Sequence, residues 1–142
     1  VHNYFITGVL LRFYDDTVEY VNAGHCNICK KYRDDAHIVL KSNGEPVEGP
    51  LLGIANFNHP FDEVTFTVNK GESILLYTDC LTEVKNNDME YGEQRIVESF
   101  KKAPNDSAES ILQHILEDFY TFSEDKNHIK DDLTVIVLKR KM

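Results

Sequence analysis

The chain has 142 residues, of which 42% are hydrophobic, and 15 basic against 24 acidic residues give it a net charge of −9. This composition predicts one folded domain with a hydrophobic core and excludes a wholly disordered chain. The negative charge repels nucleic-acid phosphates and anionic lipid, and no apolar run approaches the ~20 residues that span a bilayer, so neither nucleic acid nor a membrane is an expected partner.

Strands are predicted throughout the first half of the chain, because short runs of branched, aromatic and alternating residues are separated there by polar turns. The apolar run near residue 75 is typical of a fully buried strand, whereas Lys30 and Lys31 are interpreted as a solvated strand face. In chain order the expected strands are residues 4–13 and 17–21, a hairpin across Asp15–Asp16; 28–32 and 37–41, a second hairpin across 33–35; and then 64–68 and 73–78, with 42–50 as a loop.

Two helices are predicted in the second half. The first covers residues 92–102, and the second begins after 104–105, with Asp106 as N-cap and Glu109 completing a capping box. Residues 133–138 form a last buried strand, so the expected fold is α+β, with mostly antiparallel strands and helices on one face. Apolar residues at helical spacing mark the buried side of the two helices: Ile96, Val97, Phe100, Ile111, Leu112, Ile115, Leu116 and Phe119.

Acidic residues stand at the ends of two predicted buried strands. Asp79 follows the strand at 73–78, and Asp131 and Asp132 precede the strand at 133–138. If these strands are antiparallel neighbours, the carboxylates converge at one edge of the sheet, where hard cations such as Mg²⁺ and Mn²⁺ find oxygen ligands. An Asp beside a strand is also a common turn or cap residue, so spacing alone leaves both interpretations open.

Five short motifs, in order and spanning nearly the whole chain, resemble those of one protein family. They are Val21–His25, similar to Asn-Ala-Gly-His; Gly49–Ile54, similar to a Pro-Leu-Gly loop with one extra Leu; Gly71–Glu83, similar to Gly-Asp-x-Leu-Leu-Leu-Tyr-Thr-Asp-Gly-Val-Thr-Glu; Tyr91–Ile96, similar to Phe-Gly-Glu-Glu-Arg-Leu; and Asp131–Leu138, similar to Asp-Asp-x-Thr and its strand. The family is that of the SpoIIE-type metal-dependent serine/threonine protein phosphatases, the bacterial branch of the type 2C enzymes.

This resemblance implies a type 2C phosphatase-like β-sandwich with flanking helices. It implies that Asp79 and Asp131 are catalytic metal ligands for two Mn²⁺ or Mg²⁺ ions and that Asp132 is not a direct ligand. The implied reaction is hydrolysis of phosphoserine or phosphothreonine on a regulatory protein, by resemblance an anti-sigma-factor antagonist. For Gly24 and His25 it favours a structural role in a tight turn over a catalytic one.

The chain also departs from the family pattern. It contains no Gly-Asp dipeptide and no Gly-His-Gly, the motifs that carry the family's other acidic ligands. Residues 1–142 are therefore interpreted as a partial domain that lacks the N-terminal metal-binding strands and follows a sensor domain in a longer protein. Because exposed strand edges pair readily, we expect dimerisation or domain swapping, and we expect this chain alone to be inactive.

Cys80 stands where the family has Gly. Either the turn is relaxed enough to accept a Cβ atom, or this member is a degenerate, non-catalytic fold that acts as a protein-binding module. Both possibilities remain open from the sequence.

The remaining cysteines offer a third class of function. Cys26 and Cys29 have zinc-ligand spacing and lie beside His25, but structural zinc needs four ligands and no second pair follows at a finger-like distance. The better interpretation is two free thiols. A small odd number of cysteines without a disulfide framework fits a reducing cytoplasm.

Overall fold

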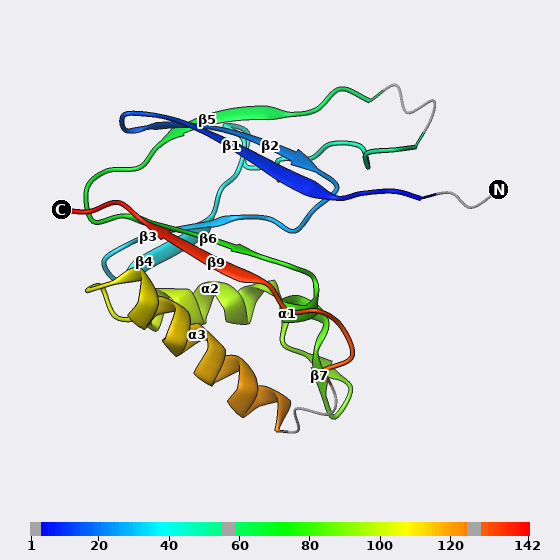
Figure 1. Cartoon of the computed structure of the whole chain (residues 1–142), viewed down its shortest axis with the longest axis vertical. Coiled ribbons are helices and arrows are strands. Elements are labelled where there is room, and N and C mark those ends of the chain that lie inside the picture. Colours follow the sequence, from blue (N-terminus) through cyan, green and yellow to red (C-terminus); the bar gives the residue numbers. More distant parts are fainter. Residues whose placement is uncertain (1–3, 55–58, 125–128) are drawn as a thin grey trace. The chain divides into compact units, whose positions relative to one another are not determined.

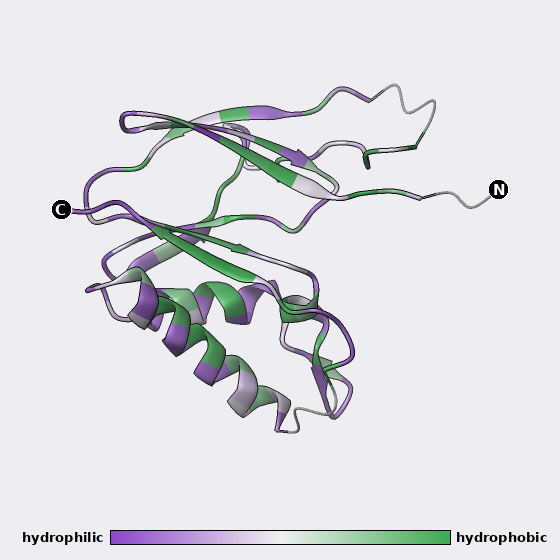
Figure 2. Ribbon diagram, in the orientation of Figure 1, coloured by the Kyte–Doolittle hydropathy of each residue, from purple (hydrophilic) through white to green (hydrophobic). Residues whose placement is uncertain are grey.

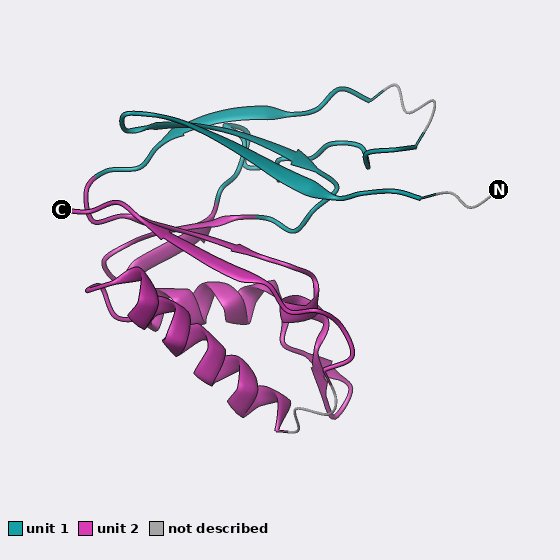
Figure 3. Cartoon of the chain, viewed as in Figure 1, with its two compact units in different colours: residues 1–27, 39–69 teal, residues 28–38, 70–142 magenta. Residues whose placement is uncertain are grey.

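The computed structural model describes residues 4–54, 59–124 and 129–142, and it divides the chain into two compact units. Unit 1 comprises residues 1–27 and 39–69, and unit 2 comprises residues 28–38 and 70–142 (Figure 3). Antiparallel strands build both units, and the α-helices found among the described residues all belong to unit 2. The predicted α+β class is confirmed, whereas the interpretation of residues 1–142 as a partial domain stays a prediction.

Unit 1 contains a three-stranded sheet in the order β1-β2-β5. The strands are β1 (Gly8–Tyr14), β2 (Thr17–Ala23) and β5 (Glu63–Thr67), and both pairs are antiparallel. The predicted hairpin is present, and Asp15 adopts a φ of 50° in its turn, a conformation that Asp tolerates. One face of β2 is buried, as the alternation in the sequence indicates: Val18, Tyr20 and Asn22.

Unit 2 contains a four-stranded antiparallel sheet in the order β4-β3-β6-β9 (Figure 1). Its strands are β3 (Cys29–Tyr32), β4 (Asp35–Ile38), β6 (Ser73–Tyr77) and β9 (Val135–Lys139). The central strand β6 pairs on both sides and is largely buried, as its continuous apolar run predicts. Strand β4 begins two residues before its predicted start, because Arg33, with a φ of 53°, allows a tight turn between β3 and β4.

Helices cover one face of this sheet (Figure 1). Helix α2 (Gly92–Lys102) packs against β4 and β3, and α3 (Ala108–Ser123) packs against β9 and α2. The short helix α1 (Cys80–Glu83) directly follows β6 and contacts α2. The predicted apolar stripes form the buried side of the two longer helices, with these residues at 0% exposure: Ile96, Phe100, Ile111, Ile115 and Phe119.

The predicted start of α3 is wrong by one residue. Ser107, not Asp106, is the N-cap: its Oγ accepts a hydrogen bond of 3.0 Å from the backbone N–H of Ser110. Ser110, not Glu109, completes the capping box, since its Oγ accepts from the backbone N–H of Ser107 at 3.3 Å. Asp106 lies one residue before the cap and accepts a hydrogen bond from the Ser110 hydroxyl. A Ser-x-x-Ser box can cap a helix as the predicted pair would, because either hydroxyl can accept from a backbone N–H.

A short hairpin between α1 and α2 escaped the sequence analysis. It consists of β7 (Lys85–Asn86) and β8 (Met89–Glu90), and its turn residues Asn87 and Asp88 have φ values of 49° and 65°. Asn and Asp are the residues that tolerate this left-handed conformation, so the Asn-Asp pair was an available signal for a two-residue turn. The side chain of Asn86 holds the hairpin to the end of α3 by donating to the backbone carbonyl of Phe122 at 2.9 Å.

Lys31 is buried, with 1% of its surface exposed, so the interpretation of Lys30 and Lys31 as a solvated face is wrong. The Lys31 ammonium group donates hydrogen bonds to the carbonyl oxygens of Phe100 (2.8 Å), Lys101 (3.0 Å) and Ala103, at the C-terminal end of α2. Burial lowers the pKa of Lys31, and the three carbonyls, together with the negative end of the helix dipole, offset the cost of burying the charge. Lys30 forms an ion pair of 2.9 Å with Glu72, which is also buried.

Apolar residues are exposed on the edge strands of both sheets. Leu10 and Phe13 lie on β1, and Ile136 and Leu138 lie on β9, a strand that Figure 2 shows as hydrophobic over much of its length. The last predicted strand is therefore present, but the prediction that it is buried is wrong, because its residues alternate between half-buried and exposed. The expectation that such edges pair with another copy of the chain stays a prediction. No helix in the described parts of the chain combines the length and the apolar character that crossing a bilayer would require.

Candidate functional site

The C-terminal end of β6 and the N-terminal end of β9 lie side by side, at the edge of the unit 2 sheet where these two strands end. The two strands are antiparallel neighbours, with Tyr77 opposite Val135. Just beyond them, the Thr78 N–H donates to the Thr134 carbonyl at 3.0 Å, and the Thr134 N–H donates to the Thr78 hydroxyl at 3.0 Å. Residues 79 and 131–133 therefore leave the sheet at the same edge, which is the arrangement that the strand-end argument required.

Asp79 occupies the N-cap position of α1, where its main chain and side chain have separate roles. Its backbone carbonyl accepts hydrogen bonds from the N–H groups of Thr82 and Glu83, each at 2.9 Å, and from the Thr82 hydroxyl at 2.8 Å. Its carboxylate forms no capping hydrogen bond, and the residue is exposed. The interpretation of Asp79 as only a cap residue thus applies to its backbone and leaves the carboxylate for another role.

Asp131 and Asp132 lie opposite Asp79, in the segment that leads into β9. The Asp131 carboxylate accepts one hydrogen bond of 3.2 Å from the Asp132 N–H, and both residues are exposed. Asp132 contributes its backbone carbonyl, which accepts from the Thr78 hydroxyl at 3.2 Å. The structure therefore places Asp131 and Asp79 at the same end of the sheet. Asp132 makes a main-chain contact that a residue of another type would retain.

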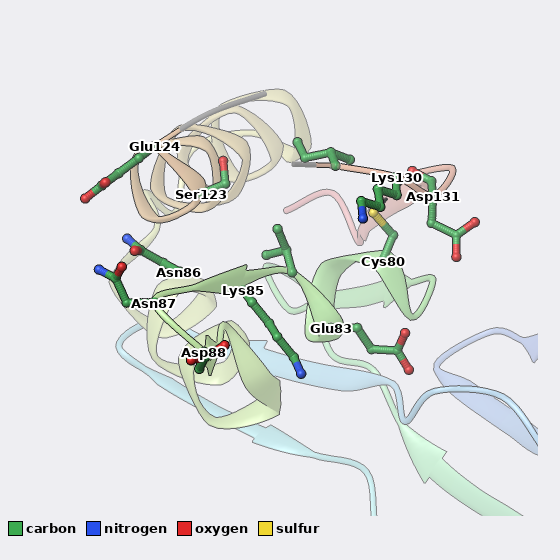
Figure 4. A pocket seen from close by; sticks show the side chains of 12 residues that line it. Cys80, Glu83, Lys85, Asn86, Asn87, Asp88, Ser123, Glu124, Lys130 and Asp131 are labelled. Atoms are coloured by element: carbon green, nitrogen blue, oxygen red, sulfur yellow. Dashed lines mark hydrogen bonds between the residues drawn. The ribbon is translucent and has the colours of Figure 1, made fainter. Parts of the chain in front are cut away.

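Cys80 links the two segments. It is only 5% exposed, and its Sγ donates to the backbone carbonyl of Asp131 at 3.4 Å, so the thiol lies beside that residue (Figure 4). Burial raises the pKa of Cys80, and the negative charges of Asp131 and Asp79 raise it further. The residue begins a helix and is not among the described residues with positive φ. The backbone at this position therefore accepts a Cβ atom without strain, so a Cys can stand where the family has Gly.

The donor set at this edge has the right chemistry for a hard divalent cation but too few members. Such ions take about six oxygen ligands. Within the part of the chain that the structure describes, no group of three or more His, Cys, Asp or Glu side chains is arranged to hold a metal ion. Asp79 and Asp131 therefore do not complete a metal site by themselves.

The Asn-Ala-Gly-His motif organises a loop in unit 1. The Asn22 side chain accepts from the His25 N–H at 2.7 Å and donates to the His25 carbonyl at 2.9 Å, while His25 Nδ1 lies 2.9 Å from the Thr7 hydroxyl. Gly24 has a φ of 64°, and a Cβ atom there would overlap the side chain of Leu51. These contacts support the structural role expected for Gly24 and His25.

This loop gives a direct test of that role. We expect Gly24→Ala to lower the free energy of unfolding by about 1–2 kcal/mol, because an L-residue is disfavoured at positive φ and Leu51 must also move. Gly8→Ala is the matched control, since Gly8 lies in β1 with open space around it, and its effect should stay within about 0.5 kcal/mol. Urea unfolding of the two variants measures the difference, and equal midpoints would refute the structural role of Gly24.

Cys26 and Cys29 are outside any disulfide, as the sequence predicts. Cys29 is buried, and burial raises its pKa to about 12, so it remains protonated at neutral pH. Cys26 is half-buried and is not part of a disulfide. The zinc hypothesis gains no further ligand among the described residues.

Comparisons with known proteins agree with the motifs. The family model for Stage II sporulation protein E (SpoIIE) matches residues 1–141. A search of curated proteins finds no significant match. Among solved structures, the phosphatase domain of the cell fate determinant SpoIIE from Bacillus subtilis, presoaked with Mn, is similar with a TM-score of 0.69 and 16% identity over 96% of this chain and 56% of that chain.

Two further structures extend this likeness. A Mycobacterium tuberculosis structure of RsbU and RsbW domains is similar with a TM-score of 0.67 and 23% identity, over 92% of this chain and 34% of that chain. The catalytic domain of the serine/threonine protein phosphatase PstP, in complex with two manganese ions, is similar with a TM-score of 0.61 and 13% identity, over 94% of this chain and 57% of that chain. The predicted type 2C phosphatase-like fold is confirmed, and the chain spans between about a third and three fifths of each structure that it matches.

Proposed function

The chain belongs to the SpoIIE family, and from this membership we propose that it takes part in metal-dependent hydrolysis of phosphoserine or phosphothreonine on a regulatory protein. The structures that it resembles include phosphatase domains from several proteins, one of them holding two manganese ions. Mn²⁺ or Mg²⁺ is the proposed cofactor, because carboxylate oxygens suit hard cations. As part of this proposal the protein is cytoplasmic, since three cysteines that form no disulfide fit a reducing compartment.

The meeting of Asp79 and Asp131 at one sheet edge is the observation that carries the proposal. The two residues are 52 positions apart in sequence, and the β6–β9 pairing brings their segments together. Both carboxylates are exposed, and neither forms an ion pair within the described residues. We propose that they are metal ligands, and that the ligands still missing come from outside the described residues.

A regulatory context is the finer part of the proposal. The motif resemblance supports a phosphorylated anti-sigma-factor antagonist as substrate and a sensor domain in the same protein. The matched structure with RsbU and RsbW domains shows that a similar fold occurs beside another domain in one chain. On this proposal, residues 1–142 contribute one part of a phosphatase domain.

The experiment is hydrolysis of a phosphoserine protein by the full-length protein, measured as phosphate release with Mn²⁺, with Mg²⁺ and after EDTA treatment. We expect release that depends on the metal. The incomplete ligand set among the described residues favours one alternative, a degenerate, non-catalytic fold that only binds partner proteins. Absence of metal-dependent release, with retained binding of a partner, would establish that alternative.

The incomplete ligand set leads to a further prediction for the 142-residue chain alone. We expect it to bind Mn²⁺ no more tightly than about 10⁻⁴ M, the weak end of the range for hard-cation sites, because two carboxylates leave most of the coordination shell to water. Isothermal titration of the EDTA-treated chain measures this affinity. Sub-micromolar binding would mean that this chain supplies a complete metal site.

A further inference from the structure

A cavity of about 740 Å³ in unit 2 adjoins the candidate site. It is bounded by α1, the β7–β8 hairpin, the C-terminal end of α3 and residues 129–131. Asp131 and Cys80 line one side of it, and Figure 4 shows Asp88 and Glu124 on the other side of the view. This volume falls in the range that holds a drug-sized ligand, so it suffices for a few residues of a polypeptide.

The lining of this cavity combines an apolar floor with a negative rim. Val84 and Cys80 are buried beneath it. Among the described residues, its charged lining residues are the acidic Glu83, Asp88, Glu124 and Asp131 and the basic Lys85 and Lys130. Lys85 also forms an ion pair of 3.7 Å with Glu90, so the described part of the rim has a negative balance of charge.

We propose that this cavity binds the polypeptide segment next to the phosphorylated residue of the substrate and selects Lys or Arg in that segment. The inference rests on the proposed function, which puts the phosphate beside Asp131. A chain with a net charge of −9 repels a phosphoprotein unless positive charge lies between the two. A basic side chain at the Asp88–Glu124 side provides that charge, because opposite charges across an interface fix orientation and favour the correct partner.

On this proposal Asp88 and Glu124, and not Asp131, select the basic side chain of the substrate, because of where they lie. Asp88 lies at the turn of the β7–β8 hairpin, and Glu124 directly follows α3. The hairpin and the end of α3 are held together by the hydrogen bond from Asn86 to Phe122. The two acidic residues thus lie on linked elements on one side of the cavity, apart from the proposed phosphate position.

Binding of unphosphorylated peptides tests the inference without relying on catalysis. Two fluorescein-labelled serine peptides, one with Arg and one with Ala two to four residues from the serine, are titrated with metal-free full-length protein, and anisotropy gives the dissociation constants. We expect the Arg peptide to bind about fivefold more tightly, as two exposed charge pairs allow. The double variant Asp88→Asn/Glu124→Gln should bring this ratio close to one, and both replacements tolerate the positive φ at their positions as well as the native residues do.

The matched control is Glu98→Gln/Glu117→Gln, which removes the same charge from exposed positions of α2 and α3 outside the cavity and should retain the Arg preference. An unchanged ratio in Asp88→Asn/Glu124→Gln, or equal binding of the two peptides by the unaltered protein, would overturn the inference. Mn²⁺-dependent hydrolysis of p-nitrophenyl phosphate, too small to reach across the cavity, tests the proposed function separately. Its absence together with an Arg preference would refute the phosphatase proposal and leave a binding site for basic peptides.

Discussion

Asp79→Asn and Asp131→Asn should each reduce Mn²⁺-dependent phosphate release by the full-length protein at least about a hundredfold. Asn preserves the shape of the side chain but removes the negative charge that a hard cation prefers in its ligands. The Asp79 carboxylate forms no capping hydrogen bond, and Asn can accept the single hydrogen bond that Asp131 receives from the Asp132 N–H. Stability should therefore change little, and the loss should appear in activity and metal affinity.

Asp132→Asn is the matched control, because it makes the same change one residue away. Asp132 uses only main-chain atoms in its contacts with Thr78 and Asp131, so we expect a loss of activity below the roughly 10–100-fold that follows removal of a side chain supporting a metal ligand. Phosphate release, a Mn²⁺ titration of activity and far-UV circular dichroism together separate ligand loss from unfolding. If Asp79→Asn and Asp131→Asn both leave activity intact, the assignment of these residues as metal ligands is wrong.

Lys31→Met should lower the free energy of unfolding by about 2–4 kcal/mol, the largest stability effect that we expect. Met retains the length and the apolar stem of the side chain, so the change isolates the ammonium group. Without it, the carbonyls of Phe100, Lys101 and Ala103 lose their shared donor in a buried position, and the C-terminal end of α2 loses a favourable charge. Urea unfolding followed by far-UV circular dichroism measures the effect.

Lys102→Met makes the same replacement on the exposed surface of the last turn of α2. We expect it to change stability by no more than about 0.5 kcal/mol. Equal effects of the two substitutions would show that burial of Lys31 and its three carbonyl contacts contribute nothing to the fold.

The extended segments and the helices were predictable wherever the sequence pattern is local. The alternation in β2, the apolar run of β6 and the whole of α2 agree with the structure. The errors came where two local solutions compete. Ser107 with Ser110 outcompeted Asp106 with Glu109 as the cap of α3, and strands of two residues, such as β7 and β8, are too short to show a period.

Lys31 shows what alternation cannot distinguish. A polar residue on one face of a strand has the same pattern whether that face meets water or the end of a helix. Its carbonyl partners lie 69 to 72 residues away, and no local signal encodes a contact of that separation.

For the candidate site, too, some features follow from the sequence and others only from the tertiary structure. The sequence alone determined which residues have suitable chemistry: Asp79 and Asp131 stand at the ends of two predicted strands, within motifs that resemble one family, and the family match over residues 1–141 agrees. Only the tertiary structure decided that β6 and β9 are antiparallel neighbours and so bring these residues to one edge. It alone decided that the Cys80 thiol joins the two segments, and that a cavity opens beside Asp131 between α1, the hairpin and α3. The physical reason is that propensity and hydrophobic period act over a few residues, whereas strand order and cavities arise from contacts between segments tens of residues apart.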